Sequence, residues 1–284
     1  MKRLIVTADD FGAAIEVNDA VEAAHRHGIL TAASLMVGGA AAADAVARAK
    51  RLPGLRVGLH LVLVEGVPVL PPSVIPDLVD HRGRFRTDMA RAGARIFFRP
   101  EVRLQVADEI AAQFARFQQF GLPLDHVNAH KHFHLHPSIA SLIIEIGRDF
   151  GMTAARVPRE PGRILKDLEP TTPAASPFLA PWTALLGLKF SRAGMLTPRH
   201  VFGLAWSGAM TRDRLVGLLN HLPAGLSEIY LHPATSNQFA DAAPGYRYTE
   251  EFSALTDSAV LDAARRSDLQ LGGFADFQHA SAGA

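Results

Sequence analysis

The sequence predicts an α/β protein built on a parallel β-sheet of seven or eight strands, open or closed into a (β/α) barrel. Short apolar runs alternate with longer segments whose apolar residues recur at helical spacing, and this alternation is typical of parallel sheets. In addition, aspartate or histidine directly follows several of the apolar runs. Because the carboxyl ends of barrel strands share one rim, this pattern would gather polar side chains in one place.

The predicted elements follow one another in a regular order. The strands cover residues 4–6, 32–37, 57–62, 125–129, 154–157, 201–204, 228–231 and 269–274. The helices cover residues 16–27, 40–51 and 102–120, and three more begin at Ser138, Thr211 and Asp257. The helix at 102–120 has the clearest pattern, because Val106, Ile110 and Phe114 share one face.

We interpret residues 1–284 as one catalytic domain, since this length is near the upper size of a single hydrophobic core. Two segments interrupt the regular alternation, at about 67–100 and 170–196, and we interpret both as insertions above the strand ends. They contain apolar runs at 96–98 and 178–190. These runs could belong to the core, line a hydrophobic substrate channel or contact a membrane surface.

The composition excludes several classes of protein. The absence of cysteine excludes disulfides, thiolate metal sites and cysteine nucleophiles, and it fits a reducing compartment. The formal net charge is +1 with mixed signs, so we expect no nucleic-acid partner. We find neither a signal peptide nor an uncharged apolar stretch of about 18 residues. We therefore expect a cytoplasmic protein, with peripheral contact at the inner membrane surface left open.

Polar residues at four predicted strand ends would converge on one rim, namely Asp9, Asp10, His60, His130 and His232. One carboxylate and two imidazoles, from Asp10, His60 and His130, could hold one divalent metal ion and leave positions open for water and substrate. Two imidazoles suit Zn²⁺, Fe²⁺, Co²⁺ or Mn²⁺ better than Mg²⁺, although the sequence leaves the identity of the ion open.

This set of residues predicts hydrolysis of an amide or an ester. A catalytic metal lowers the pKa of its bound water towards ~7 and polarises a carbonyl group. Asp9 would be the general base that takes a proton from this water. His232 would be the general acid for the leaving group.

Each of these residues also has a purely structural interpretation. Asp9 and Asp10 could cap the helix that follows, and His60 could be a buried core histidine. The histidine cluster at 130–136 is harder to explain structurally, because alternating side chains of one extended segment point the same way. We therefore predict a site at this cluster, in which not all four histidines can be ligands.

Three further residues are candidates for substrate contact. Arg156 and Arg159 follow a predicted strand and could hold a substrate oxygen, hold the Asp9 carboxylate or be surface charges. Tyr246 lies in a loop after Gly245 and could contact a sugar or only pack that loop.

Five motifs resemble the YdjC/ChbG family of carbohydrate deacetylases over about residues 3–275. They are Thr-Ala-Asp-Asp-Phe-Gly at 7–12, Gly-Leu-His-Leu at 58–61, Asn-Ala-His-Lys-His-Phe-His at 128–134, Arg-Val-Pro-Arg-Glu at 156–160 and His-Pro at 232–233. The double aspartate and the His-x-His-x-His block are specific in combination, and either alone would not be.

The resemblance implies a distorted TIM-like (β/α) barrel of the polysaccharide-deacetylase kind, often dimeric. It also implies metal-dependent hydrolysis of the N-acetyl group of an amino sugar. Asp9 matches the proposed base. The positions that match metal ligands are Asp10, His60 and His130. The remaining candidates, which we assign to substrate binding, are His132, His134, Arg156, Arg159 and Tyr246.

A closer similarity is to the branch of this family found with hopanoid biosynthesis, carried by residues 32–37, 128–137, 200–210 and 272–274. This branch implies an N-acetylglucosaminyl hopanoid lipid as the substrate. A soluble chito-oligosaccharide substrate and a non-catalytic sugar- or metal-binding protein on the same scaffold are the alternatives. Asn128 departs from the aspartate of many family members, which could alter the support of His130.

Overall fold

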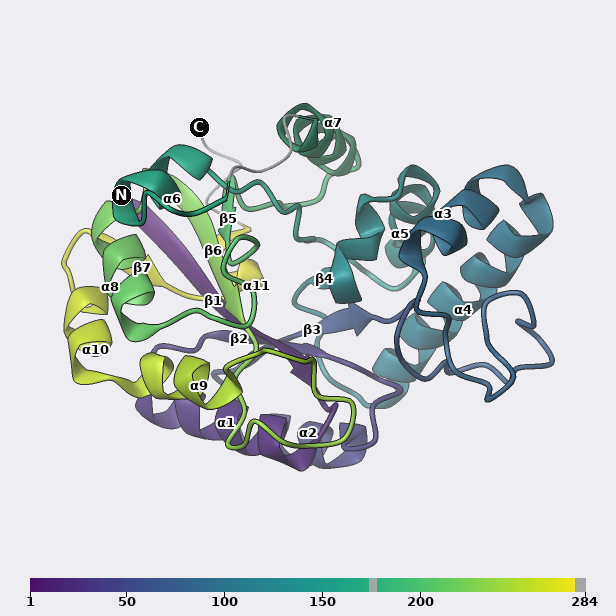
Figure 1. Ribbon diagram of the computed structural model, residues 1–284, viewed down its shortest axis with the longest axis horizontal. Helices are drawn as coiled ribbons and strands as arrows, with labels where there is room; N and C mark the ends of the chain where they lie inside the picture. Colours follow the sequence, from purple (N-terminus) through teal and green to yellow (C-terminus); the bar gives the residue numbers. More distant parts are fainter. Residues whose placement is uncertain (174–177, 279–284) are drawn as a thin grey trace.

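The computed structural model describes residues 1–173 and 178–278 and contains one parallel sheet (Figure 1). Its seven strands are β1 (Lys2–Phe11), β2 (Ala32–Leu35), β3 (Arg56–Leu61), β4 (Val127–Ala129), β5 (His200–Phe202), β6 (Gly225–Leu231) and β7 (Leu269–Leu271). Neighbouring strands follow the order β4-β3-β2-β1-β6-β5, and β7 pairs with the first residues of β1. The α/β class and a count of seven strands agree with the prediction.

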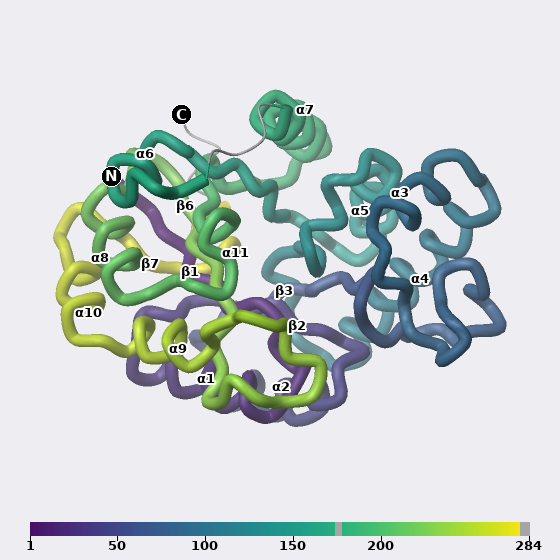
Figure 2. Tube along the Cα trace, in the orientation of Figure 1, coloured from purple at the N-terminus to yellow at the C-terminus, as the bar shows by residue number. Residues whose placement is uncertain are grey.

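Helices connect the strands and cover the sheet. In the first half of the chain they are α1 (Ile15–His27), α2 (Ala42–Ala49), α3 (Met89–Phe98), α4 (Pro100–Gln119), the 3-10 helix η1 (His130–Leu135) and α5 (Pro137–Asp149). In the second half they are α6 (Gly162–Leu168), α7 (Leu179–Arg192), α8 (Arg212–His221), α9 (Tyr248–Thr256), α10 (Ser258–Ala264) and α11 (Phe274–Phe277). Figure 2 shows α1, α2 and α9 along one side of the central strands and α3, α4 and α5 beyond β3 and β4.

β1 is the central strand of the molecule. It pairs with β2, β6 and β7, and its residues Leu4, Ile5 and Val6 have no exposed surface. Parallel strands that are covered on both faces have such continuous apolar runs. Full burial of each of these side chains contributes about 1.5–3 kcal/mol. The aspartates at the end of β1 are therefore attached to a well-anchored strand.

The sheet is open, so the closed form of the predicted barrel is wrong. β4 and β5 are the two ends of the strand order. The strand predicted at 154–157 makes only isolated bridges, between Ala155 and Val127 and between Ala154 and Leu196. Pro158 follows immediately and has no backbone N–H to donate, so this short segment does not extend into a ladder that could close the sheet.

The two predicted insertions fold differently from each other. The first is irregular up to residue 88, apart from one antiparallel bridge between Val79 and Phe85, and then forms α3. The second contains α7, and residues 174–177 of the predicted insertion lie outside the described residues, as do residues 279–284 of the predicted domain. Within residues 1–173 and 178–278, no helix is long and apolar enough to cross a membrane.

Candidate active site

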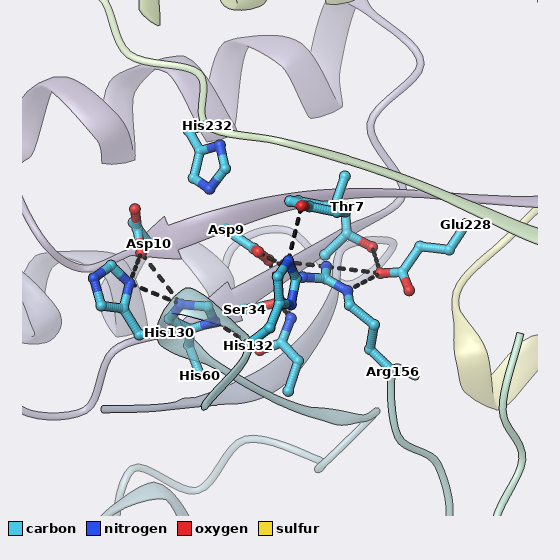
Figure 3. A network of polar contacts seen from close by, with 12 residues as sticks. Thr7, Asp9, Asp10, Ser34, His60, His130, His132, Arg156, Glu228 and His232 are labelled. Carbon is cyan, nitrogen blue, oxygen red and sulfur yellow. Dashed lines mark hydrogen bonds and ion pairs between the residues drawn. The ribbon is translucent and has the colours of Figure 1, made fainter. Parts of the chain in front are cut away.

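Two consecutive aspartates near the end of β1, Asp9 and Asp10, occupy different environments (Figure 3). Asp9 is buried, whereas Asp10 is partly exposed. The register between β1 and β2 shifts between Ala8 and Phe11, and Asp10 has a left-handed backbone with φ of 62°. Such a conformation in a non-glycine residue costs about 1–3 kcal/mol and is concentrated at functional sites. This irregularity breaks the alternation of strand side chains, and both carboxylates line the same cavity.

Asp10, His60 and His130 bring three potential metal-ligand atoms together. Asp10 Oδ1 lies 3.2 Å from both His60 Nε2 and His130 Nδ1, and these two nitrogens are 3.4 Å apart. Burial alone would raise the pKa of Asp10, but the two imidazoles outweigh burial and hold this pKa well below its usual value. An ionised carboxylate and two imidazole nitrogens, all within 4.8 Å of one another, fit a divalent transition metal.

His60 is oriented by its other ring nitrogen. His60 Nδ1 lies 2.6 Å from Asn128 Oδ1, because β3 and β4 pair in a register that sets these two residues opposite each other. Partners of this kind fix the ring orientation of metal-binding histidines. Asn128 thus supports His60, and the expectation that it supports His130 is wrong.

Asp9 belongs to a buried ion-pair network on the other side of the site. Arg156 Nη2 lies 2.9 Å from Asp9 Oδ1 and 2.8 Å from Glu228 Oε1, and Thr7 donates to the same glutamate oxygen at 2.8 Å. The Arg156 guanidinium also lies over the Tyr230 ring, 4.4 Å from its centroid. Burial favours the neutral carboxyl, but the charge and hydrogen bonds of Arg156, together with the nearby His60 and His232, outweigh burial and lower the pKa of Asp9. Asp9 therefore stays ionised and fixed in direction.

The structure distinguishes between the roles that the sequence left open for Arg156. Its side chain has no exposed surface, and it holds the Asp9 carboxylate. Arg156 does not line the cavity that contains the two aspartates. The assignment of Arg156 to substrate binding is thus replaced by a role in positioning Asp9.

The two aspartates open into a cavity of about 680 Å³ at the carboxyl ends of the strands. His232 follows β6 and lines this cavity, across the aspartates from His60 and His130 (Figure 3). Its backbone N–H donates to the buried Glu251, and its Nδ1 is buried without a hydrogen-bond partner among the described residues. Because Nδ1 is shielded from the cavity and lies 3.9 Å from Glu251 Oε2, Nε2 is the ring nitrogen left for chemistry in the cavity.

The histidine cluster is not extended, so the prediction that its alternate side chains point the same way is wrong. It forms η1, in which Lys131 and His132 both have φ of 53°, because the chain turns here from β4 into α5. His132 lines the cavity and lies 2.8 Å from the Tyr230 hydroxyl. His134 is buried away from the cavity against the Arg156 carbonyl oxygen, and burial lowers its pKa to about 3.

The last two candidates lie in different places. Tyr246 lines the cavity, and its hydroxyl is 2.8 Å from Ser207 Oγ. Arg159 instead lines a neighbouring apolar cavity of about 530 Å³, which shares Leu204 with the first one. Contact of Arg159 with a substrate therefore requires a ligand that extends beyond the aspartate cavity.

Sequence reasoning missed Glu228. It lies within β6, between Ser227 and Ile229, and has no exposed surface. An ionisable residue inside a buried parallel strand is a usable signal, because an unpaired charge there is strongly unfavourable. The signal predicts a buried cationic partner, which the structure identifies as Arg156.

The fold and the site define the class: an open parallel α/β protein whose strand ends surround a cavity lined by acidic residues and histidines. The family model described as YdjC-like protein matches residues 3–266. The chain therefore belongs to the YdjC-like family.

Similar proteins match between about half and nearly the whole of the chain. A carbohydrate deacetylase of Geobacillus stearothermophilus is 29% identical over 96% of this chain and 97% of its own length. A chitooligosaccharide deacetylase of Serratia marcescens is 34% identical over 62% of this chain and 66% of its own length. A carbohydrate deacetylase of Brevibacillus brevis is 39% identical over 52% of this chain, and the match spans only 56% of that relative's own length.

A solved structure shares the fold. It is that of a proposed cellobiose-phosphate cleavage protein from Enterococcus faecalis, with a TM-score of 0.74 and 22% identity, and the match covers 97% of this chain and 98% of the other. This likeness supports only the fold, in which an open parallel sheet does not close into a barrel.

Proposed function

We propose that this protein is a metal-dependent N-deacetylase that removes acetyl groups from N-acetylated amino sugars. The observation that carries the proposal is the cavity of about 680 Å³ in which the ionised Asp9 lies beside the cluster of Asp10, His60 and His130. Relatives described as carbohydrate and chitooligosaccharide deacetylases support the substrate class.

In this proposal Asp10, His60 and His130 hold one divalent ion, whose identity we leave open among zinc, magnesium, manganese and cobalt. When bound, such an ion polarises the amide carbonyl and lowers the pKa of the attacking water. The remaining chemistry belongs to side chains of the cavity.

Asp9 accepts a proton from the water that adds to the amide carbon. Its carboxylate is suited to this because Arg156 and Asn128 hold it in one direction. His232, across the cavity, donates a proton to the sugar nitrogen as the C–N bond breaks. The products are acetate and the free amine. His132 and Tyr246 line the same cavity and are the substrate contacts we retain.

The finer substrate that we propose is an N-acetylglucosaminyl hopanoid lipid. Large apolar side chains are exposed on both insertions, notably Phe97, Phe98, Phe178, Leu185 and Leu188. Such side chains suit a lipid tail or peripheral contact with the inner membrane surface. The alternatives are a soluble chito-oligosaccharide substrate and a sugar- or metal-binding role without catalysis. The intact pair Asp9 and Asp10 favours catalysis.

The test compares acetate release from an N-acetylglucosaminyl lipid in detergent and from N,N′-diacetylchitobiose, each with protein loaded with Zn²⁺, Mn²⁺, Co²⁺ or Mg²⁺. We expect release from at least one substrate, and faster release from the lipid. Faster release from the sugar would contradict the lipid assignment but keep the activity. Tight metal binding with no release from any amino sugar would favour the non-catalytic alternative.

Two further assignments remain predictions. A homodimer, which the family resemblance implies, is checked by light scattering coupled to size-exclusion chromatography. A cytoplasmic location with peripheral membrane contact is checked by fractionating cells and by sedimenting the protein with lipid vesicles.

A further inference from the structure

A chain of buried polar side chains leads from the active site into the interior, beyond the residues that hold metal or act on substrate. It runs from His60 through Asn128, Ser34 and His126 to Asp125, with contacts of 2.6, 2.8, 3.0 and 2.9 Å. Each of these residues is at most 5% exposed. Burying a polar group is unfavourable unless it is hydrogen-bonded, and here each member is satisfied by its neighbours in the series.

The amide of Asn128 can lie in only one orientation. Its Nδ2 lies 3.1 Å from the Asp9 carboxylate and 2.8 Å from Ser34 Oγ. The carboxylate only accepts hydrogen bonds, so the amide nitrogen must face it and the amide oxygen must face His60. His60 Nδ1 then carries a hydrogen, so Nε2 is the ring nitrogen that faces Asp10 and His130 and is placed to bind a metal ion there.

The next two members extend this order in one direction. Asp125 accepts from His126 Nδ1, so in the neutral ring His126 Nε2 is an acceptor. Ser34 accepts from Asn128 and uses its single hydrogen to donate to His126 Nε2. Every donor from His60 to Asp125 therefore points the same way, and hydrogen bonds in such a series strengthen one another.

The far end of the chain is anchored by the backbone. The two Asp125 oxygens accept from the N–H groups of Phe274, at 3.2 Å, and Ala275, at 2.9 Å. The His126 ring is stacked on Phe274 with centroids 4.3 Å apart. Gly58 also lies against the ring, since a Cβ there would come within 2.5 Å of it. These contacts restrict the movement of the ring.

We propose that Ser34, His126 and Asp125 are positioning residues, which hold Asn128 and through it keep His60 in the tautomer and orientation that present Nε2 to the Asp10 and His130 site. Through Asp125, this series of hydrogen bonds also connects the site to Phe274 and Ala275, the first two residues of α11. The inference that Ser34, His126 and Asp125 support metal binding rests on the proposed function.

The main test is a Co²⁺ titration of metal-free protein, followed by the absorption of the bound ion, for wild type, Ser34→Ala and Ser227→Ala. Ser227 is the matched control, since it is a fully buried strand serine whose hydroxyl has no hydrogen-bond partner among the described residues. We expect Ser34→Ala to weaken Co²⁺ binding about 10- to 100-fold and Ser227→Ala to leave it unchanged. Equal affinity of the Ser34→Ala variant and wild type would overturn the proposal.

Histidine ¹⁵N chemical shifts of the metal-free protein give a second readout that needs neither metal nor activity. We expect His60 Nδ1 to carry hydrogen in wild type and to be only partly protonated in Ser34→Ala and in Asp125→Asn. A wild-type His60 without hydrogen at Nδ1, or an unchanged spectrum in both variants, would overturn the proposal. If wild type binds no Co²⁺, the proposed metal-dependent function fails, whereas this measurement still tests the positioning chain.

Discussion

At the residue scale, the two consecutive aspartates act through different partners. Asp9 is paired with Arg156 in the interior, whereas Asp10 meets His60 and His130 at the cavity. The sequence could predict that these residues meet, because each follows an apolar strand. Glu228, the second partner of Arg156, was missed because it lies within β6 and not at the carboxyl end of a strand, where the candidates were sought.

Replacement of Asp9 by asparagine should remove the base with little change in shape. We expect kcat for acetate release to fall by about 10²- to 10⁴-fold, which is the usual contribution of a positioned general base. Steady-state kinetics on an N-acetylated amino sugar measure this fall.

The matched control is Glu228→Gln, which removes the other carboxylate from Arg156 but leaves the base in place. Both variants disturb the same buried ion pair, and each should lose up to about 3–5 kcal/mol of stability. Only Asp9→Asn should show the large loss in kcat. An equal loss in both variants would mean that Asp9 acts through the packing of Arg156.

At the element scale, strand ends are easier to predict than the turns that follow them. The end of β4 was predicted correctly at residue 129, but η1 was predicted as extended. The error arises because Lys131 and His132 adopt left-handed conformations, which are uncommon in residues other than glycine. As a result His132 faces the cavity and His134 does not.

The first insertion is held to α4 by Glu109, a buried carboxylate that accepts from the N–H groups of Val69, at 2.8 Å, and Leu70, at 3.0 Å. Glu109→Gln replaces one acceptor oxygen by a donor, which leaves one of these N–H groups unsatisfied. We expect a loss of about 1–3 kcal/mol in unfolding free energy at pH 7, measured by urea denaturation. A change below about 0.5 kcal/mol would contradict this anchoring role.

The same glutamate should make stability depend on pH. Burial raises the pKa of Glu109 in the folded protein, in spite of the hydrogen bonds that lower it. The folded state then binds more protons than the unfolded state as pH rises from the unfolded pKa to the folded one, so the unfolding free energy falls across this interval. The advantage of wild type over Glu109→Gln should therefore shrink with rising pH there. An advantage that grows would contradict the direction of the shift.

At the scale of the whole molecule, the sequence predicted the parallel sheet, but it left open whether the sheet closes. Closure depends on pairing between distant segments, and local periodicity carries no information about that pairing. Ala154 and Ala155 make single bridges where a further strand was expected, and the sheet stays open between β4 and β5.

A metal that binds only the folded chain stabilises it by mass action, by about 2.7 kcal/mol at a free concentration 100 times Kd. We expect a chelator to lower the Tm of metal-loaded protein by several degrees in a calorimetric scan. The Asp10→Asn variant, which lacks one ligand, should show little or no shift. An identical shift in both proteins would place the bound metal elsewhere.

The central claim is most directly tested by measuring acetate released from N,N′-diacetylchitobiose and from an N-acetylglucosaminyl lipid by metal-loaded wild type, metal-free wild type and metal-loaded Asp9→Asn. We predict that only metal-loaded wild type releases acetate at an appreciable rate, and that restoring the metal restores activity to the metal-free sample. Undiminished release by metal-free protein or by Asp9→Asn would contradict the mechanism, and no release by any sample would contradict the proposed activity.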